Sequence, residues 1–195
     1  MAMLTNAAVK FLRFAAVGEN AQISNCASFY GAGRIRIGRN VRIDDYCVIS
    51  AGAGGIEIGD YVHIAVGSSI IGAGKVTLSD FSNVSSRVAI YSSNDDYSGE
   101  YLTNPTIPDE YKNVRHADVF IGRHVIIGSG SVVLPGINIG DGVAVGSLSL
   151  VNKDCDEFGI YAGVPAKRVK ERKRNLLELE KSFLVKQNQS RERDM

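Results

Sequence analysis

A six-residue repeat of aliphatic side chains is the feature that most constrains how this chain can fold. In the second half of the chain it runs without interruption through Ile121, Ile127, Val133, Ile139, Val145 and Val151. Shorter runs precede it at Ile37, Ile43 and Ile49, at Ile58, Ile64 and Ile70, and at Leu78, Val84 and Ile90, with a fainter start at Ile23 and Phe29. A period of six fits neither an amphipathic helix, with a period of about 3.6, nor a continuous half-buried strand, with a period of about 2. It fits a strand that turns a corner every six residues.

The repeat predicts an all-β fold, a parallel β-helix in which three short strands close each triangular coil and the aliphatic side chains stack inside. About six coils spaced by about 4.8 Å would make a prism roughly 29 Å tall. Glycines follow four repeat residues directly, and we expect them to adopt corner dihedrals that a Cβ atom penalises: Gly122, Gly128, Gly140 and Gly146. The slip at residues 50–55 predicts a small bulge. A β-sandwich is the alternative, but its strands recur about every 8–12 residues.

Three segments lie outside the repeat, and all 195 residues are expected to form one domain. Residues 1–20 form the expected N-terminal cap, with a short helix over residues 4–16. The β-helix covers residues 21–158 and is interrupted by a polar excursion loop over residues 91–118. Residues 159–195 contain a terminal turn, a basic helix from about residue 168 to residue 187 and a tail. The helix has Leu176, Leu179 and Phe183 as its apolar stripe.

Composition narrows the class of protein. The formal net charge of +1 argues against bulk electrostatic binding to nucleic acid. No run approaches the ~20 apolar residues that span a bilayer, so no membrane insertion is expected. The three cysteines, Cys26, Cys47 and Cys155, have no metal-ligand spacing and fit reduced thiols. Together with an N-terminus that does not match a secretory signal, they predict a cytoplasmic protein.

Residues 161–167, Tyr-Ala-Gly-Val-Pro-Ala-Lys, follow the last repeat and carry a family resemblance. With the repeat before it and basic residues after it, this turn resembles the hexapeptide-repeat acetyltransferases, of the galactoside, maltose and xenobiotic types. It is most similar to the sugar acetyltransferases of O-antigen and capsule biosynthesis. The resemblance implies a left-handed winding, a homotrimer, acetyl-CoA as co-substrate in the groove between neighbouring prisms, and an acceptor sugar under the excursion loop.

The loop departs from the galactoside-type pattern, in which the resemblance places a catalytic His. Here the matching stretch contains Asn94, Asp95, Asp96, Tyr97 and Ser98. A sugar hydroxyl needs a strong base, whereas a sugar amine titrates near neutrality and needs mainly positioning. We therefore expect Asp95 or Asp96 to position an amine and take its proton, with Asn94, Tyr97 and Ser98 as substrate contacts. The alternative is that the two aspartates only hold the turn at the tip of the loop.

The histidines give further candidates. His63 is the first alternative base and His116, at the end of the loop, is the second. His124 matches a His of some relatives that the chemistry of the family does not require. The spacing of these three histidines fits no zinc-ligand pattern, so no metal is expected.

Acetyl-CoA binding is expected along the later coils. Backbone N–H groups around Gly128, Gly130, Ala144 and Gly146 are candidate donors to the thioester oxygen, and their small side chains would let the pantetheine arm lie flat. Lys153, Lys167 and Arg168 are the candidates for the CoA phosphates, with Lys167 favoured because it belongs to the family-like turn.

Three functions are compatible with these features. The leading hypothesis is acetyl-CoA-dependent N-acetylation of a nucleotide-linked amino sugar for surface polysaccharide biosynthesis, which the carboxylates of the loop favour. The alternative is O-acetylation of a sugar or glycan, which the galactoside-type turn favours. A non-catalytic β-helix scaffold is the third possibility, but it needs neither the long polar loop nor the terminal turn.

Overall fold

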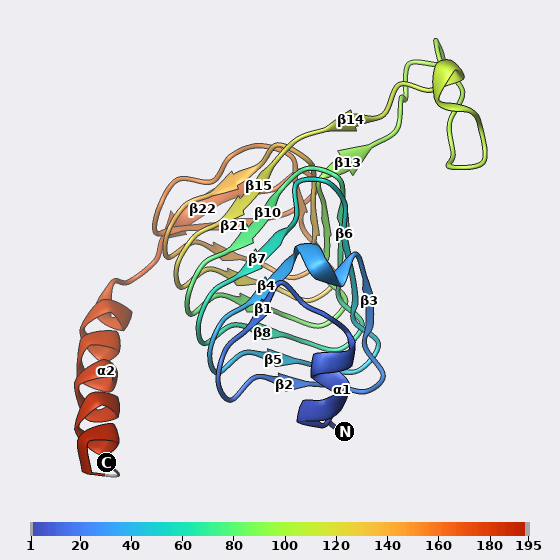
Figure 1. Ribbon diagram of the computed structural model, residues 1–195. Helices are drawn as coiled ribbons and strands as arrows, with labels where there is room; N and C mark the ends of the chain where they lie inside the picture. Colours follow the sequence, from blue (N-terminus) through green and yellow to red (C-terminus); the bar gives the residue numbers. More distant parts are fainter. Residues whose placement is uncertain (1, 194–195) are drawn as a thin grey trace.

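The computed structural model describes the backbone of residues 2–193, and it is a parallel β-helix (Figure 1). The chain visits three sheets in turn, and each coil adds one strand to each sheet. The first and third sheets have 6 strands each and the second has 8. The parallel β-helix predicted from the repeat is confirmed, but the chain continues past the six predicted coils, because Cys155 bridges to Ile139 and Gly159–Ala162 pairs in parallel with Ala144–Val145.

Sheet one contains β1 (Ala16–Val17), β4 (Ile35–Ile37), β7 (Ile56–Ile58), β10 (Val76–Leu78), β15 (Val119–Ile121) and β18 (Asn138–Ile139). Sheet two contains β2 (Gln22–Ile23), β5 (Arg42–Ile43), β8 (His63–Ile64), β11 (Asn83–Val84), β16 (Ile126–Ile127), β19 (Ala144–Val145), β21 (Gly159–Ala162) and β22 (Lys167–Glu171). Sheet three contains β3 (Ser28–Tyr30), β6 (Val48–Ala51), β9 (Ser69–Gly72), β12 (Ala89–Tyr91), β17 (Val132–Val133) and β20 (Leu150–Val151).

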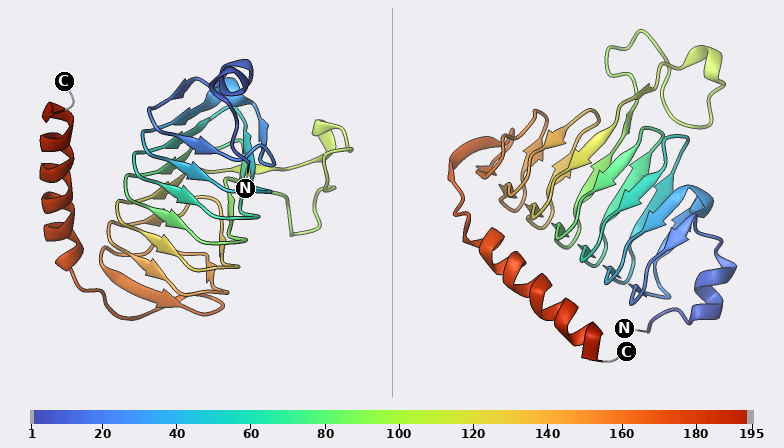
Figure 2. Two further views of the ribbon diagram at one scale, coloured as in Figure 1. Left: turned by 90° about the horizontal axis from the view of Figure 1, so that it is seen from below. Right: turned by 60° about the vertical axis from the view of Figure 1, so that its left-hand side comes forward.

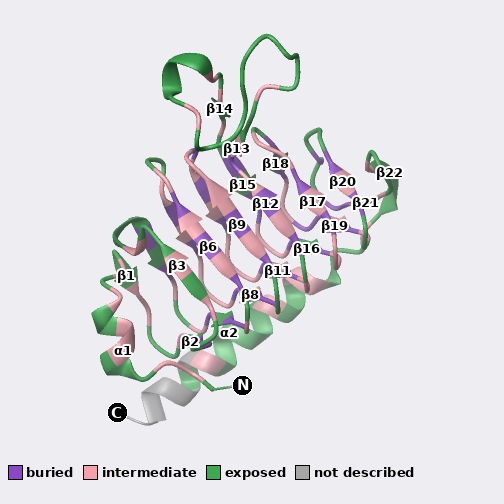
Figure 3. Ribbon diagram, turned by 90° about the vertical axis from the view of Figure 1, so that its right-hand side faces the viewer, coloured by how far each residue is buried: buried purple, intermediate pink, exposed green. Residues whose placement is uncertain are grey.

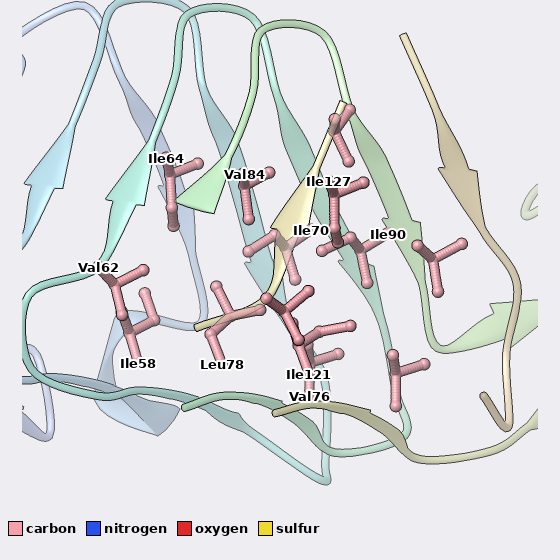
Figure 4. Close-up of a cluster of buried hydrophobic side chains, with 14 of the residues drawn as sticks. Ile58, Val62, Ile64, Ile70, Val76, Leu78, Val84, Ile90, Ile121 and Ile127 are labelled. Carbon is pink, nitrogen blue, oxygen red and sulfur yellow. The ribbon is translucent and has the colours of Figure 1, made fainter. Parts of the chain in front are cut away.

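The repeat residues form the core of the prism. In the parallel register of sheet one, Leu78 pairs with Ile58 on one side and Ile121 on the other. Ile64, Val84 and Ile127 form the corresponding column in sheet two. Figure 4 shows these side chains converging inside the prism, and all six are buried. Stacking like on like in each coil makes the core one continuous apolar column, which explains the strict spacing.

The glycines beside the repeat residues have a different role from the one expected. Left-handed backbone at the corners belongs mostly to other residues, including Tyr61 (φ 58°), Phe81 (φ 60°) and His124 (φ 56°). Gly122 and Gly128 are needed because the next coil is close. A Cβ atom at Gly128 would lie 2.4 Å from the backbone N of Ser147. The expectation of corner dihedrals at these glycines was wrong. The close approach of the next coil is the reason that these positions need glycine.

The N-terminal helix is shorter than predicted. The helix α1 spans Asn6–Phe11 instead of residues 4–16. The Thr5 side chain accepts a hydrogen bond from the N–H of Ala8 and caps its start, and Arg13, with φ 55°, lies in left-handed backbone just beyond its end. Leu4 and Val9 pack against the core, so the segment covers the first coil as expected. A 3-10 helix, η1 (Ala32–Arg34), precedes β4.

The C-terminal segment differs from the prediction of a helix over residues 168–187. Lys167–Glu171 form β22, which pairs antiparallel with β21, and the helix α2 spans Asn175–Arg193. β21 pairs in parallel with β19 on one side, and β22 supplies partners for the backbone groups of its outer edge, where the β-helix has no further coil. Figure 2 shows α2 running back along one edge of the prism. Among residues 2–193, no helix is both long and apolar enough to cross a membrane.

The excursion loop leaves the prism after β12 and returns before β15, as predicted. Its root is an antiparallel ribbon of β13 (Ser93–Asn94) and β14 (Arg115–His116), and it contains a 3-10 helix, η2 (Asp109–Tyr111). Figures 1 and 3 show the loop projecting from the prism with mostly exposed residues. A loop this far from its own core is free to contact another molecule.

Candidate active site

The excursion loop encloses a cavity of about 360 Å³ against the prism. Its lining residues are Ile71, Ser93, Asn94, Asp95, Asn104, Pro105, Lys112 and Val114. Two of the predicted residues, Asn94 and Asp95, therefore line one cavity. Lys112 supplies a cation whose side chain is 12% exposed and pairs with the exposed Asp109 carboxylate at 2.8 Å.

Asp96 has a structural role in the turn at the tip of the loop. Its carboxylate accepts hydrogen bonds from Ser98 Oγ at 2.8 Å and from the N–H of Gly99 at 3.1 Å. The hydrogen bond from Ser98 holds the pKa of the Asp96 carboxyl below its usual range. A carboxylate committed in this way is a weaker proton acceptor. Tyr97 is exposed and does not line the cavity, and Ser98 contacts Asp96, so these three residues do not join Asp95.

His116 lies at the root of the loop. Its Nδ1 is 2.7 Å from Ser93 Oγ, and the same hydroxyl accepts a hydrogen bond from the N–H of Ala73. His116 is exposed and lines a second cavity of about 400 Å³ with Asp109, Lys112 and Val114. His116 therefore does not line the acceptor cavity itself but contacts Ser93, which does, and the two cavities share Lys112 and Val114.

His63 lies outside the loop, on the outward face of sheet two. Its Nε2 is 2.9 Å from Asp44 Oδ2, and its Nδ1 is 3.1 Å from Asn83 Oδ1. Burial opposes ionisation of Asp44, but hydrogen bonds from Arg42 and His63 outweigh it and lower the pKa of the carboxyl. Because both ring nitrogens have hydrogen-bond partners, the His63 ring is held in place and neither nitrogen is free to accept a proton from a substrate.

Asp44, Asn83 and Ser85 were missed in the sequence. Asn83 Nδ2 is 3.5 Å from Ser85 Oγ, which extends the bonded chain from His63 across the next coil. The signal was present, because Asn83 follows His63 by one coil of 20 residues and pairs with it in the sheet. Outward residues of a β-helix can be aligned in this way once the coil length is known.

The predicted CoA surface lies where the later coils pass from sheet two to sheet three. The N–H groups of Gly128 and Gly146 donate to Val145 O at 2.8 Å and Tyr161 O at 2.7 Å, and Gly130 donates to Ser86 O at 3.0 Å. These amides hold successive coils together, so their remaining contribution is a flat surface of small residues. Ala144 adds to it from β19.

The cations proposed for the CoA phosphates lie at the C-terminal end of the prism. Lys153 is exposed beyond the last full coil, and Lys167 and Arg168 are exposed on β22. Arg168 pairs with Glu171 at 2.6 Å, which leaves Lys153 and Lys167 as the two cations of this set that form no ion pair among the described residues.

His124 connects α2 to the prism. Its Nε2 lies 2.7 Å from Glu180 Oε2, and its ring stacks on Phe81 with centroids 5.0 Å apart. Arg123 also pairs with Glu180. These contacts make His124 a structural residue. Among the described residues, His, Cys, Asp and Glu side chains form no group of three or more that could hold a metal ion.

Comparison with known proteins places this architecture in a family. No protein-family model matches the chain. It is 58% identical over 183 residues to dTDP-4-amino-4,6-dideoxy-D-glucose acyltransferase of Escherichia coli, covering 94% of this chain and 95% of that protein. It is 30% identical over 160 residues to galactoside O-acetyltransferase of Escherichia coli (strain K12), covering 81% of this chain and 64% of that protein.

Solved structures agree with the sequence relatives. The fold matches AntD, an N-acyltransferase from Bacillus cereus, with a TM-score of 0.91 and 43% identity, covering 95% of this chain and 98% of that one. That structure holds dTDP-4-amino-4,6-dideoxyglucose and coenzyme A, and another AntD structure holds dTDP and 3-hydroxybutyryl-CoA. This chain is an acyltransferase and belongs to the hexapeptide-repeat acyltransferase family, together with the dTDP-amino-sugar enzymes it resembles over nearly its whole length.

Proposed function

We propose that this enzyme transfers the acetyl group of acetyl-CoA to the amine of a dTDP-linked 4-amino-4,6-dideoxy sugar. The observation that carries the proposal is 58% identity, over 94% of the chain, to an enzyme named for that acceptor. Asp95 in the cavity under the loop supports it, because a carboxylate is the group that best binds a sugar ammonium.

Asp95 is favoured over Asp96 because it lines the cavity, whereas Asp96 is hydrogen-bonded within the turn at the loop tip. Solved AntD variants replace one serine and one aspartate, and the numbers given for these two positions differ by ten. In this chain Ser85 and Asp95 have that spacing, as do Ser86 and Asp96. Because Asp96 is committed to the turn at the loop tip, the pair Ser85 and Asp95 fits better.

The reaction requires little acid–base machinery. The amine nitrogen attacks the thioester carbonyl carbon, a C–N bond forms, the C–S bond breaks, and CoA leaves as its thiol after taking up a proton. Asp95 binds the ammonium form of the acceptor, aligns it and accepts a proton from it as the nitrogen becomes a nucleophile. Ser85 Oγ accepts an N–H hydrogen bond and orients the nitrogen lone pair.

We propose a homotrimer with shared sites. Ser85 follows β11 on sheet two, whereas Asp95 belongs to the loop that leaves sheet three after β12. A neighbouring prism whose sheet two lies beside the loop would bring the two residues together. The slim prism supports this arrangement, because one prism has little interior and its flat faces gain apolar burial by packing against copies of themselves.

The proposed setting is surface polysaccharide biosynthesis in the cytoplasm. The three cysteines, Cys26, Cys47 and Cys155, are all free thiols, which fits a reducing compartment. Acetyl-CoA and nucleotide-linked sugars are the two co-substrates that this setting must supply.

O-acetylation is the second candidate, and one observation favours it. His116 is exposed at the root of the loop beside the acceptor cavity, where a His base could act on a hydroxyl. The similarity to galactoside O-acetyltransferase supports the same reaction.

The test is a free-thiol assay with acetyl-CoA against dTDP-4-amino-4,6-dideoxyglucose, the corresponding 4-hydroxy sugar nucleotide and galactosides. The proposal expects turnover with the amino sugar and an amide product by mass spectrometry. Turnover restricted to the hydroxyl acceptors refutes it. A parallel series with 3-hydroxybutyryl-CoA tests the acyl group. Preference for that donor would refute the acetyl group as the group transferred and would leave the amino-sugar acceptor unaffected.

A further inference from the structure

Four polar side chains from three successive coils form a hydrogen-bonded ladder on sheet two: Asp44, His63, Asn83 and Ser85. Asp44 Oδ2 is 2.9 Å from His63 Nε2, His63 Nδ1 is 3.1 Å from Asn83 Oδ1, and Asn83 Nδ2 is 3.5 Å from Ser85 Oγ. Arg42 Nε donates to the other oxygen of Asp44 at 2.7 Å. The mechanism proposed above uses only the last member of this polar ladder.

Counting donors and acceptors shows that the ladder has two states. An ionised Asp44 can only accept, so Nε2 of His63 must carry a proton. With Asn83 Oδ1 toward the ring, Nδ1 must also carry one, and His63 is an imidazolium. When His63 is neutral, Nδ1 accepts, and Asn83 must turn its NH2 group toward the ring and its oxygen toward Ser85.

The two states reverse the hydrogen bond at Ser85. With cationic His63, Asn83 donates to Ser85 Oγ, and the hydroxyl proton is left to point at the acceptor amine. With neutral His63, the hydroxyl donates to Asn83, and the lone pairs of Oγ face outward. A nucleophilic amine needs its own lone pair free, so only the second state lets Ser85 accept an amine N–H without blocking the attack.

We propose that Asp44, His63 and Asn83 are positioning residues that set the direction of the hydrogen bond at Ser85 Oγ, with neutral His63 as the productive form. The inference rests on the proposed amine acylation and on contact of Ser85 with the amine. The charged groups in the contacts around His63 are Asp44, bonded to Nε2, and Arg42, which pairs with Asp44. The coil on the other side presents Asn83, which is uncharged.

The first experiment is the pH dependence of kcat at saturating acetyl-CoA and dTDP-4-amino-4,6-dideoxyglucose. Wild type should show two ionisations, that of the amine and that of His63, and His63→Asn should keep only the first. His63→Asn should lower kcat several-fold when Ser85 is present and less than about twofold in a Ser85→Ala background, because coupled residues are not additive. His124→Asn, which removes a second His–carboxylate pair that shares no hydrogen bond with the four ladder residues, is the matched control and should keep both ionisations.

A second pair of variants separates the effect of the hydrogen-bond direction at Ser85 from the effect of side-chain packing at position 83. Asn83→Asp offers a carboxylate that accepts from both His63 and Ser85, which fixes the productive direction, so it should keep at least half of kcat. Asn83→Leu should lose several-fold. Three results would each overturn the proposal. They are an equal loss of kcat in the two Asn83 variants, additive effects of His63→Asn and Ser85→Ala on kcat, and an unchanged pH profile of kcat in His63→Asn.

Failure of the proposed function is distinguishable from failure of the ladder. Absence of wild-type turnover with the amino sugar refutes the proposed function. Normal wild-type turnover together with an unchanged pH profile of kcat in His63→Asn refutes only the ladder. NMR of the His63 ring nitrogens gives a reading without turnover. Asn83→Asp should raise the pH at which Nδ1 loses its proton, and an unchanged titration overturns the proposal.

Discussion

Replacing Asp95 by Asn tests the assignment of the acceptor site most directly. The Asp95 carboxylate lines the loop cavity and has no hydrogen bond or ion pair among the described residues, so the change removes its charge without breaking a structural contact. A hydrogen bond to a charged group contributes about 1.5–3 kcal/mol, which corresponds to roughly 12- to 160-fold. We expect kcat/KM for the amino sugar to fall by about 10²-fold, with an unchanged melting temperature.

Asp96→Asn is the matched control for this prediction. An Asn side chain can still accept the hydrogen bonds from Ser98 and Gly99, so the turn should persist and kcat/KM should stay within about threefold. The assay is CoA release followed with a thiol reagent at several acceptor concentrations. Near-full activity of Asp95→Asn, or an equal loss in Asp96→Asn, would refute the assignment. If His116→Asn were inactive in the same series, a His base acting on a hydroxyl would become the better account.

Four further predictions follow from other parts of the molecule. Lys167→Ala should raise the KM for acetyl-CoA several-fold and leave the acceptor KM unchanged in steady-state kinetics, since an exposed phosphate contact contributes roughly 1 kcal/mol; no change in either KM removes Lys167 from the CoA site. Leu78→Ala, at a fully buried repeat position, should lower the free energy of unfolding by about 2–5 kcal/mol in urea titrations, and a loss below 1 kcal/mol contradicts the continuous core. The pKa of Asp44 is lowered from 3.8 in the fold, so its contribution to stability is present above pH 3.8 and lost as pH falls through the lower folded value; thermal melts of Asp44→Asn should show a shallower acid dependence there than wild type. Light scattering at micromolar concentration should give three times the chain mass, and a fully active monomer rules out shared sites.

The sequence by itself determined the architecture, because a β-helix repeats one local rule. Each inward position, such as Ile64 or Val84, is specified by its own coil and the next, and the spacing of six is visible without any long-range information. The excursion loop was equally visible as a break in that spacing. The turn at residues 161–167 then pointed to the family, which the comparisons confirm.

The tertiary structure decided the roles of residues that the sequence left ambiguous. Asp95 and Asp96 are identical in type and adjacent in sequence, and only the fold of the loop commits one of them to Ser98 and leaves the other in the cavity. Gly128 looked like a corner residue, but it is required by the backbone of Ser147 in the next coil. Local pattern cannot report the contact at Gly128, because it joins residues about one coil apart.

Lys167–Glu171 shows the same limit at the end of the chain. Its basic residues suggested a helix, but the segment forms a strand instead, because the unpaired backbone groups on the outer edge of β21 offer it a row of hydrogen-bond partners. The ladder from Asp44 to Ser85 likewise exists only once coils of 20 residues are stacked in register. Periodicity specifies what lies inside the prism, whereas the contacts between coils and at the free edges specify what the outer surface can do.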